Sequence, residues 1–491
     1  MLFGSISSLT ATAVAFLPFL ATTFAQGNCG GIVQNSLLET YSVIYTTNFT
    51  ILTINGLNNN HNHESYVLYC GDTIPDGIAL MTYGLGPDSV KIKVPLTYVI
   101  VSDTHASSYI EISGHGDSIA FLHEPERIVS PCLQKRFQDK TLLPFDNSEF
   151  QWNTVNAGIL ENMYSARSKA IWIPASIEVD PLLRIEYITV VSMFYNDGEH
   201  GQLLYNEIKS AYTNLKADMA QIPPENKKRI AWVKYDFTLG TWKLRNSAFT
   251  RGIIEAAGGI SFPLNGDGVP DDYSISSDEI KTLLLNAQIV IDQTNFTGQD
   301  GSVQQWRTLA GFSSSQELPV LASWNVYTLD NTVNENGDSD YDYRLASRPD
   351  ILLKDLIYVQ YPQYNPNYST TFLNLNFAKN DGKPNVLKAT DCGLVKYNSG
   401  DIPVIVRNPT FTGDATPPPA PTGGGIYGSG NDDGSKAEGG GSKTGIIVAV
   451  ICVVVILGAG FAFVFFKWGK RAKEDRFIEL EEEMNNDIPL H

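Results

Sequence analysis

One stretch of this chain is too apolar to fold in water, and it fixes where the folded part must lie. Residues 445–466 ("GIIVAVICVVVILGAGFAFVFF") carry no charge over 22 positions, which is long enough for a helix that spans a bilayer. Four basic residues follow directly: Lys467, Lys470, Arg471 and Lys473. The positive-inside rule therefore predicts a single-pass type I protein at the plasma membrane, with its main mass outside the cell.

The segments at both ends are not expected to build a core. Residues 1–25 are apolar and end in small residues, which is typical of a cleaved signal peptide, although no basic residue precedes the apolar part. Residues 410–444 are rich in Pro, Gly and Ser and predict a disordered stalk. Residues 467–491 form a cytoplasmic tail too short for a catalytic domain. The function therefore lies between residues 26 and 409.

Cysteines and sequons agree with a secreted part. An even number of cysteines in an oxidising compartment predicts two disulfides, with three pairings open, among Cys29, Cys70, Cys132 and Cys392. Candidate glycosylation sites are Asn48, Asn295 and Asn367. The formal net charge of −18 argues against a nucleic-acid partner.

A long helical pattern divides the folded part. Over residues 201–220, apolar side chains recur at the three- and four-residue spacing of an amphipathic helix. The preceding segment, residues 180–196, opens with Asp180 as a natural N-cap and Pro181 at the first helical position. Its β-branched run also fits a strand, and we favour the helix.

Strands and helices alternate on both sides of this pattern. In the second half we expect strands at 229–236, 259–262, 288–293 and 318–324, and helices at 241–257 and 276–287. The first half repeats the pattern more weakly, and residues 41–69 have strand character that would add an antiparallel edge. Alternation of this kind predicts two Rossmann-like α/β lobes with mostly parallel sheets. The expected division is 26–198 for the N-terminal region and first lobe, 199–222 for the interlobe helix, and 223–409 for the second lobe.

Four segments in this order resemble a known family. They are "LTYVIVSDTHASSYIEISGHGDSIAFL", "DPLLRIEYITVVSMFYN" with "LLYNEIKSAY", "FTRGIIEAAGGISF" and "SRPDILLKDLIYVQYP". Over residues 95–362 the chain resembles the class III periplasmic substrate-binding proteins of the cobalamin and ferric-siderophore type. The segments "YVLYCGDTIP" and "SPCLQKR" are similar to fungal, membrane-anchored surface forms of this fold.

The resemblance implies a function and partners. It implies capture of a small molecule, such as an iron chelate or a corrinoid, in a cleft between the lobes, with no resident cofactor. Bacterial relatives pass their ligand to an ATP-driven permease. Nothing in this chain encodes one, so an unidentified membrane transporter would be a separate partner.

Strand ends nominate the ligand-binding residues. In α/β sheets, ligands bind beyond the carboxyl ends of strands, and in two-lobed binders these ends face the cleft. The nominees are polar or aromatic residues at or near such ends: Thr104, His105, Glu178, Tyr235, Asp236, Trp242, Asp292, Trp324 and Tyr327. Aromatic walls with a few polar groups suit a large planar or chelated ligand.

Catalytic and metal-binding motifs are absent or incomplete. The chain has no G-x-S-x-G elbow, Walker loop, H-E-x-x-H or C-x-x-C motif, so we expect no enzyme and no metal site. His61, His63 and Glu64 lie in an Asn-rich stretch that we interpret as a loop, and residues 265–272 lack the closing glutamate of an EF-hand. Residues 334–343 ("NENGDSDYDY") predict a solvated acidic loop. Two alternatives stay open: a surface recognition or adhesion protein that uses the fold as a scaffold, and a cleft hydrolase with paired carboxylates.

Overall fold

The structure is a computed structural model, and it describes the folded part of the chain with a few gaps. The described residues are 29–34, 39–55, 63–160, 168–262, 272–296, 301–313, 317–379 and 383–393. The predicted signal peptide, stalk, membrane span and tail lie outside these residues. Within the described residues, none of the helices combines the length and apolarity needed to cross a bilayer.

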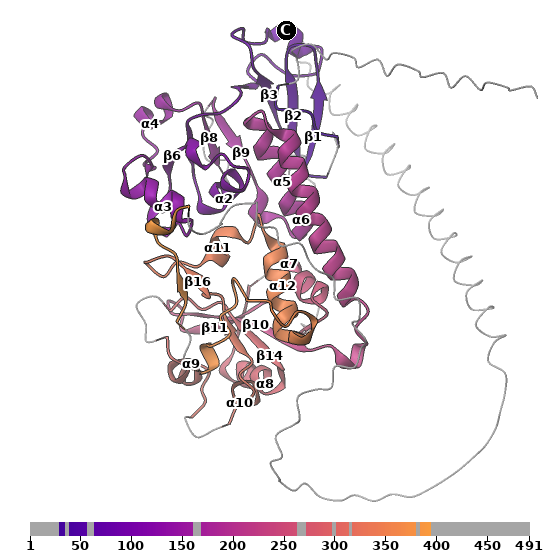
Figure 1. Cartoon of the computed structure of the whole chain (residues 1–491), viewed down its shortest axis with the longest axis vertical. Helices are drawn as coiled ribbons and strands as arrows, with labels where there is room; N and C mark the ends of the chain where they lie inside the picture. The colour runs from indigo at the N-terminus through magenta and orange to yellow at the C-terminus, as the bar shows by residue number, and fades with distance from the viewer. Residues whose placement is uncertain are drawn as a thin grey trace, which may run out of the picture. The chain divides into compact units, whose positions relative to one another are not determined.

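The first lobe is built on a five-stranded parallel sheet (Figure 1). Its strand order is β7-β6-β5-β8-β9, with β5 at Val99–Val101, β6 at Ile119–Leu122, β7 at Leu143–Pro144, β8 at Ala157–Leu160 and β9 at Ala170–Trp172. The helices of this lobe are α2 (Thr104–Ile112), α3 (Pro131–Gln138) and α4 (Glu149–Thr154), with short 3₁₀ turns η1 (Gly116–Ser118), η2 (Pro125–Arg127) and η3 (Ala175–Ile177). The order β5, α2, β6 confirms that strands and helices alternate in the first half as well.

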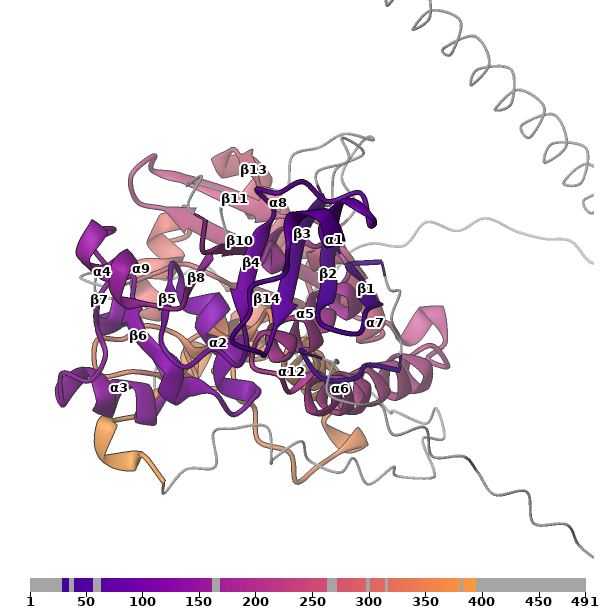
Figure 2. The same cartoon turned by 90° about the horizontal axis from the view of Figure 1, so that it is seen from above.

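A second sheet precedes the first lobe. It contains β1 (Tyr41–Tyr45), β2 (Thr50–Asn55), β3 (His63–Tyr69) and β4 (Val90–Lys93). The short helix α1 (Gly77–Met81) lies in the connection between β3 and β4. Figure 2 shows these four strands side by side. The expectation that residues 41–69 add an edge to the first-lobe sheet is wrong, because these strands pair only with each other and with β4. The sheet packs on helix α5 instead, where the Tyr66 and Phe194 rings meet edge to face at 5.5 Å.

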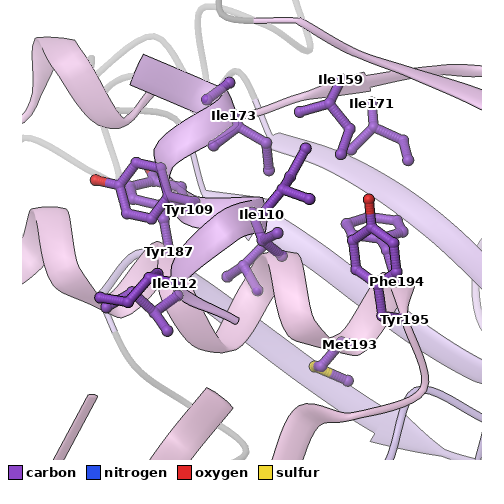
Figure 3. Close-up of a cluster of buried hydrophobic side chains, with 14 of the residues drawn as sticks. Tyr109, Ile110, Ile112, Ile159, Ile171, Ile173, Tyr187, Met193, Phe194 and Tyr195 are labelled. Atoms are coloured by element: carbon purple, nitrogen blue, oxygen red, sulfur yellow. The ribbon is translucent and has the colours of Figure 1, made fainter. Parts of the chain in front are cut away.

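Two helices in succession lead from the first lobe to the second. Helix α5 spans Pro181–Phe194, with the Asp180 side chain accepting from the Leu182 N–H, so the helical reading of this segment is confirmed. The side chains of α5 are buried on nearly all sides of the helix. Figure 3 shows its Tyr187, Met193 and Phe194 among isoleucines from α2, β8 and β9. Helix α6 spans Gly198–Met219 and confirms the helix expected over 201–220.

The second lobe has a mixed sheet of six strands. The order is β13-β11-β10-β14-β15, with β12 also paired to β10. The parallel strands are β10 (Arg229–Asp236), β12 (Ile260–Ser261), β14 (Ile289–Asp292) and β15 (Val326–Thr328), and the antiparallel ones are β11 (Thr241–Arg245) and β13 (Asp272–Ile275). The helices are α7 (Ala248–Ala256), α8 (Ser277–Asn286), α9 (Val303–Leu309), α10 (Pro319–Ala322), α11 (Asp340–Arg344) and α12 (Pro349–Gln360). The smaller elements are β16 (Thr332–Val333), β17 (Asn385–Val386), η4 (Pro224–Asn226), η5 (Pro362–Tyr364), η6 (Phe377–Lys379) and η7 (Ala389–Asp391). The two-lobed α/β fold is thus confirmed.

Two predicted elements of the second lobe are wrong. The helix expected over 241–257 begins only at Ala248, because Trp242 and Leu244 are buried alternately with half-exposed neighbours, which is the period of a strand. The strand expected over 318–324 is helix α10, which has Pro319 at its first position, and the strand follows at Val326.

Residues 334–343 are not the solvated loop that their acidic composition predicts. Asn334, Asp340, Tyr341 and Tyr343 are all buried. They lie in a segment that leaves the second-lobe sheet after β15 and meets the first lobe through α11. The acidic side chains are compatible with burial because Asp340 is paired with Arg344 one helical turn later.

The predicted cysteines form two disulfides, Cys29–Cys70 and Cys132–Cys392. All three sequon asparagines, Asn48, Asn295 and Asn367, are exposed. Their glycosylation stays a prediction.

Candidate functional site

The segments that follow β5 and β6 of the first lobe lie against the second lobe. After β5, the Asp103 side chain caps α2 by accepting from the Ala106 N–H at 2.7 Å. One turn further along α2, the Ser108 hydroxyl hydrogen bonds to the Ser347 hydroxyl at 3.0 Å, next to the start of α12. The predicted residues Thr104 and His105 begin α2 and are partly exposed. Both therefore lie on an element that contacts the other lobe.

Charged groups from both lobes gather around Asp342. His105 and Arg127 come from the first lobe, Lys234 from β10, and Asp338 from the segment before α11. We call these five residues the interlobe cluster. The Asp342 side chain is exposed, yet crowding by protein atoms raises the pKa of its carboxyl, and the nearby side chains of Arg127, Lys234 and His105 lower it.

The residues of the interlobe cluster differ in whether they form ion pairs. Arg127 pairs with Glu124 at 2.9 Å and with Asp338 at 3.3 Å. In contrast, within the part of the chain that the structure describes, neither Lys234 nor Asp342 has an ion-pair partner. An ammonium and a carboxylate on different elements, both accessible, can each bind a complementary group on a ligand.

Glu178 lies inside the first lobe. It follows η3 and is buried, and this burial raises its pKa to about 7, with the nearby Glu186 carboxylate raising it further and Arg184 lowering it. The Arg184 side chain donates to the carbonyls of Glu178 at 2.7 Å and Ser176 at 3.1 Å, and it lies over the Phe249 ring of α7 at 3.9 Å. Glu178 therefore helps to hold the loop after β9, and its carboxylate has little surface for a ligand.

The nominees on β10, β11 and β14 lie together at one end of the second-lobe sheet. Asp236 accepts from the backbone of the β10–β11 turn and pairs with Lys243 at 3.0 Å. Tyr235 and Trp242 face each other edge to face at 5.3 Å, and the Trp242 indole is buried and donates to the Leu309 carbonyl. Trp242 thus has a core position.

Asp292 is fully buried at the end of β14. Its carboxylate accepts from the Thr294 N–H at 2.9 Å and from the Thr294 hydroxyl at 2.5 Å. Burial raises its pKa to about 7. It organises the turn after the strand, where the Thr294 hydroxyl also accepts from the Tyr235 N–H.

Trp324 and Tyr327 lie on different sides of the start of β15, because this strand begins at Val326 and not at residue 318. Trp324 precedes β15, so it lies at the amino end of this strand and not at a carboxyl end, with a φ of 63°. Its exposed ring has the Lys379 ammonium at 5.4 Å from the ring centre. Tyr327 is buried within β15 and donates to the Asn325 side chain at 3.1 Å. The ligand-binding role of all nine nominees stays a prediction.

Sequence reasoning missed most of the interlobe cluster. Only His105 was nominated. Asp342 and Asp338 lie in the segment that the composition predicts to be a solvated loop, Lys234 lies within strand β10, and Arg127 lies in the loop after β6. The rule of strand carboxyl ends could have found Arg127, because it follows β6 by five residues. The described residues contain no group of three or more side chains placed to hold a metal ion.

Known proteins resemble this chain in structure only. No family model matches the chain, and no curated protein matches its sequence. Among solved structures, a periplasmic binding protein from Veillonella parvula has 11% identity and a TM-score of 0.44, covering 63% of this chain and 97% of that one. The petrobactin-binding protein from Bacillus subtilis has 13% identity and a TM-score of 0.42, covering 63% and 99%. The periplasmic vitamin B12 binding protein of Vibrio cholerae has 11% identity and a TM-score of 0.39, covering 54% and 97%.

These neighbours are periplasmic solute-binding proteins, so the resemblance that the sequence suggested is confirmed. They do not test the fungal-like, membrane-anchored form. At such identities and TM-scores the likeness concerns the fold alone and assigns no ligand to this chain.

Proposed function

We propose that this protein binds a small molecule at the junction of its two lobes, on the outer face of the plasma membrane. The observation that carries the proposal is the interlobe cluster, where Asp342 and Lys234 are charged, accessible and without an ion-pair partner among the described residues. Because both groups are accessible and neither is committed to another side chain, both can bind complementary groups of a ligand. A ligand with both an acidic and a basic or metal-chelating part would complement them.

The proposal extends to the class of ligand, which would be an iron chelate or a corrinoid. Two structural neighbours are a petrobactin-binding protein and a vitamin B12 binding protein, and the ligands that we would try first are a ferric siderophore, haem and cobalamin. The cell-surface location rests on the predicted signal peptide and membrane span. If ligand moves onward into the cell, a separate membrane transporter would receive it.

Native mass spectrometry on the purified full-length chain tests this function. The chain is mixed in turn with a ferric hydroxamate, haem and cobalamin, and we expect a one-to-one complex with one of them. Asp342→Asn and Lys234→Ala should each weaken that complex at least tenfold. Asp278→Asn, a change of the same type at an exposed position of α8, should leave the affinity unchanged. Equal weakening by all three variants, or by none, would place the ligand elsewhere.

A second candidate function is surface recognition with the lobes as a fixed scaffold. It is favoured by the burial of Asn334, Tyr341 and Tyr343 between the lobes, where an acidic loop was expected. If no member of the panel binds, the same protein preparation can be assayed for adhesion to cells, with the interlobe variants as controls. Loss of adhesion on changing exposed residues, together with normal adhesion of Asp342→Asn, would favour this candidate.

A further inference from the structure

The two lobes are joined a second time, by segments far along the chain from α6. The first segment, residues 329–347, leaves the second-lobe sheet after β15 and carries β16 and α11. The second, residues 383–393, carries β17 and η7. We call the two segments together the latch. Strand β17 pairs in parallel with β16, so the two segments are bonded to each other, and the Leu387 N–H donates to the Val333 carbonyl at 2.8 Å.

The latch is anchored in the second lobe at its base. The Asn331 N–H donates to the Phe372 carbonyl at 3.1 Å, and the Asn331 side chain donates to the Thr370 carbonyl at 2.7 Å. The Ser339 hydroxyl bonds to the Leu329 carbonyl and folds the first segment back on itself. These contacts keep the latch attached to the second lobe whatever the first lobe does.

The first segment is bonded to the loop after β6 of the first lobe. The buried Asn334 amide donates to the carbonyls of Glu126 at 2.9 Å and Ile128 at 3.1 Å. The Asn336 amide donates to the same Glu126 carbonyl at 2.9 Å. Because these bonds go to backbone carbonyls of η2, they fix the position of the loop as well as its contact.

Helix α11 extends the contact into both hydrophobic cores. Tyr341 packs in the core of the second lobe, near Trp232, and Tyr343 packs in the core of the first lobe. The Tyr343 hydroxyl donates to the buried Glu111 carboxylate of α2 at 3.0 Å. Two tyrosines that are two positions apart therefore pack in the hydrophobic cores of two different lobes. Separating the lobes would expose one of these rings to water.

The second segment is joined covalently to the first lobe. Leu387 is buried in the first-lobe core, and its carbonyl accepts from the Gln134 amide of α3 at 3.2 Å. Five residues later, Cys392 forms the disulfide with Cys132 at the start of α3. In Figure 1, α6 lies on the right and the latch, marked by β16 and by α3 above it, lies on the left.

We infer that the latch, in addition to the connection through α6, holds the two lobes in one relative orientation. A hinge needs freedom about one axis. The latch adds a disulfide, the Asn334 and Asn336 hydrogen bonds and the packing of α11 to the chain connection through α6, and contacts at several separate points together oppose rotation about any one axis. The inference concerns the lobes themselves and does not depend on the ligand proposed above.

The test measures the distance between the lobes in the full-length chain. Spin labels are attached through noncanonical amino acids at two exposed positions, Phe150 in the first lobe and Leu285 in the second, so that the cysteines stay untouched. We expect one narrow distance distribution in the otherwise unchanged protein. The double variant Cys132→Ser/Cys392→Ser should at least double the width of that distribution.

Two further variants make the result decisive. The double variant Cys29→Ser/Cys70→Ser removes the other disulfide, which joins residues before the lobes, and it should leave the distribution narrow. If the Cys132→Ser/Cys392→Ser protein does not fold, Asn334→Ala/Asn336→Ala decides, because it keeps both disulfides and removes the bonds to Glu126 and Ile128. Broadening in this variant supports the latch. An unchanged width in the variants of the latch, or equal broadening in the Cys29/Cys70 control, overturns it.

Discussion

Asp350, in the first turn of α12, is held between two cations in the interior, and its replacement gives a strong test of the fold. Its carboxylate accepts from the Arg348 guanidinium at 2.8 and 3.0 Å and from the Lys354 ammonium at 2.9 Å. The side chains are 0%, 5% and 9% exposed in that order. The two cations therefore hold the pKa of the Asp350 carboxyl well below its usual value despite burial.

Asp350→Asn should destabilise the protein by about 3–5 kcal/mol, which is the typical cost of removing one partner from a buried ion pair. The amide keeps the size of the side chain but leaves two buried cations without a counter-charge. The cost should shrink as the pH falls below about 4, because the Asp350 carboxyl of the unfolded wild-type chain then binds a proton that the folded state excludes, so the wild type itself loses stability. Replacing all three residues by Met, Leu and Met should recover most of the stability, since no buried charge remains.

Urea unfolding at pH 7, followed by fluorescence, measures these differences from the midpoints and slopes. The matched control is Asp139→Asn on α3, which removes an exposed Asp that pairs at 2.7 Å with Lys135 four residues away. It should cost less than about 1 kcal/mol. If both variants cost the same, burial does not decide the strength of these pairs and the reasoning fails.

Three smaller predictions follow from single contacts. Gly158→Ala should cost about 1–3 kcal/mol in unfolding free energy, because a Cβ at this position would lie 2.4 Å from the Trp152 ring; a thermal scan that shows no change would contradict this. Burial raises the pKa of Glu111 to about 7, so the folded state binds this proton more tightly than the unfolded state and stability should fall as the pH rises from about 4.5 to 7; urea midpoints of Glu111→Gln should lack this part of the pH dependence. Asp180→Ala should cost about 1 kcal/mol through loss of the α5 N-cap, and Asp180→Asn, which can still accept from the backbone, should restore most of it in the same urea assay.

Local patterns in the sequence were sufficient to predict the long helices. Residues 201–220 repeat apolar side chains at helical spacing, and the structure has α6 there. The predicted N-cap Asp180 gave the same kind of information for α5. These signals lie within one turn of the elements that they define, so a single sequence contains them.

Local patterns in the sequence do not predict the contacts between segments that are far apart in the chain. Asn334 is polar and sits in an acidic stretch, and its burial depends on carbonyls of Glu126 and Ile128 more than 200 positions earlier. Lys234 and Asp342 lie near each other for the same reason, because α11 packs between the lobes. The short strand at Thr241–Arg245 was missed because five residues are too few to separate its period from that of the helix that follows.

The disulfide between Cys132 and Cys392 also sets the order in which the molecule can be completed during its synthesis. Its cysteines are 260 residues apart, whereas Cys29 and Cys70 are 41 apart. At about 5–20 residues per second, Cys132 emerges roughly 13–50 s before its partner exists, and Cys70 is already present as an alternative partner. The first lobe also lacks Leu387 from its core throughout this interval. Its completion therefore waits for the last described segment of the chain, and a fragment that ends before residue 383 would lack a part of both lobes.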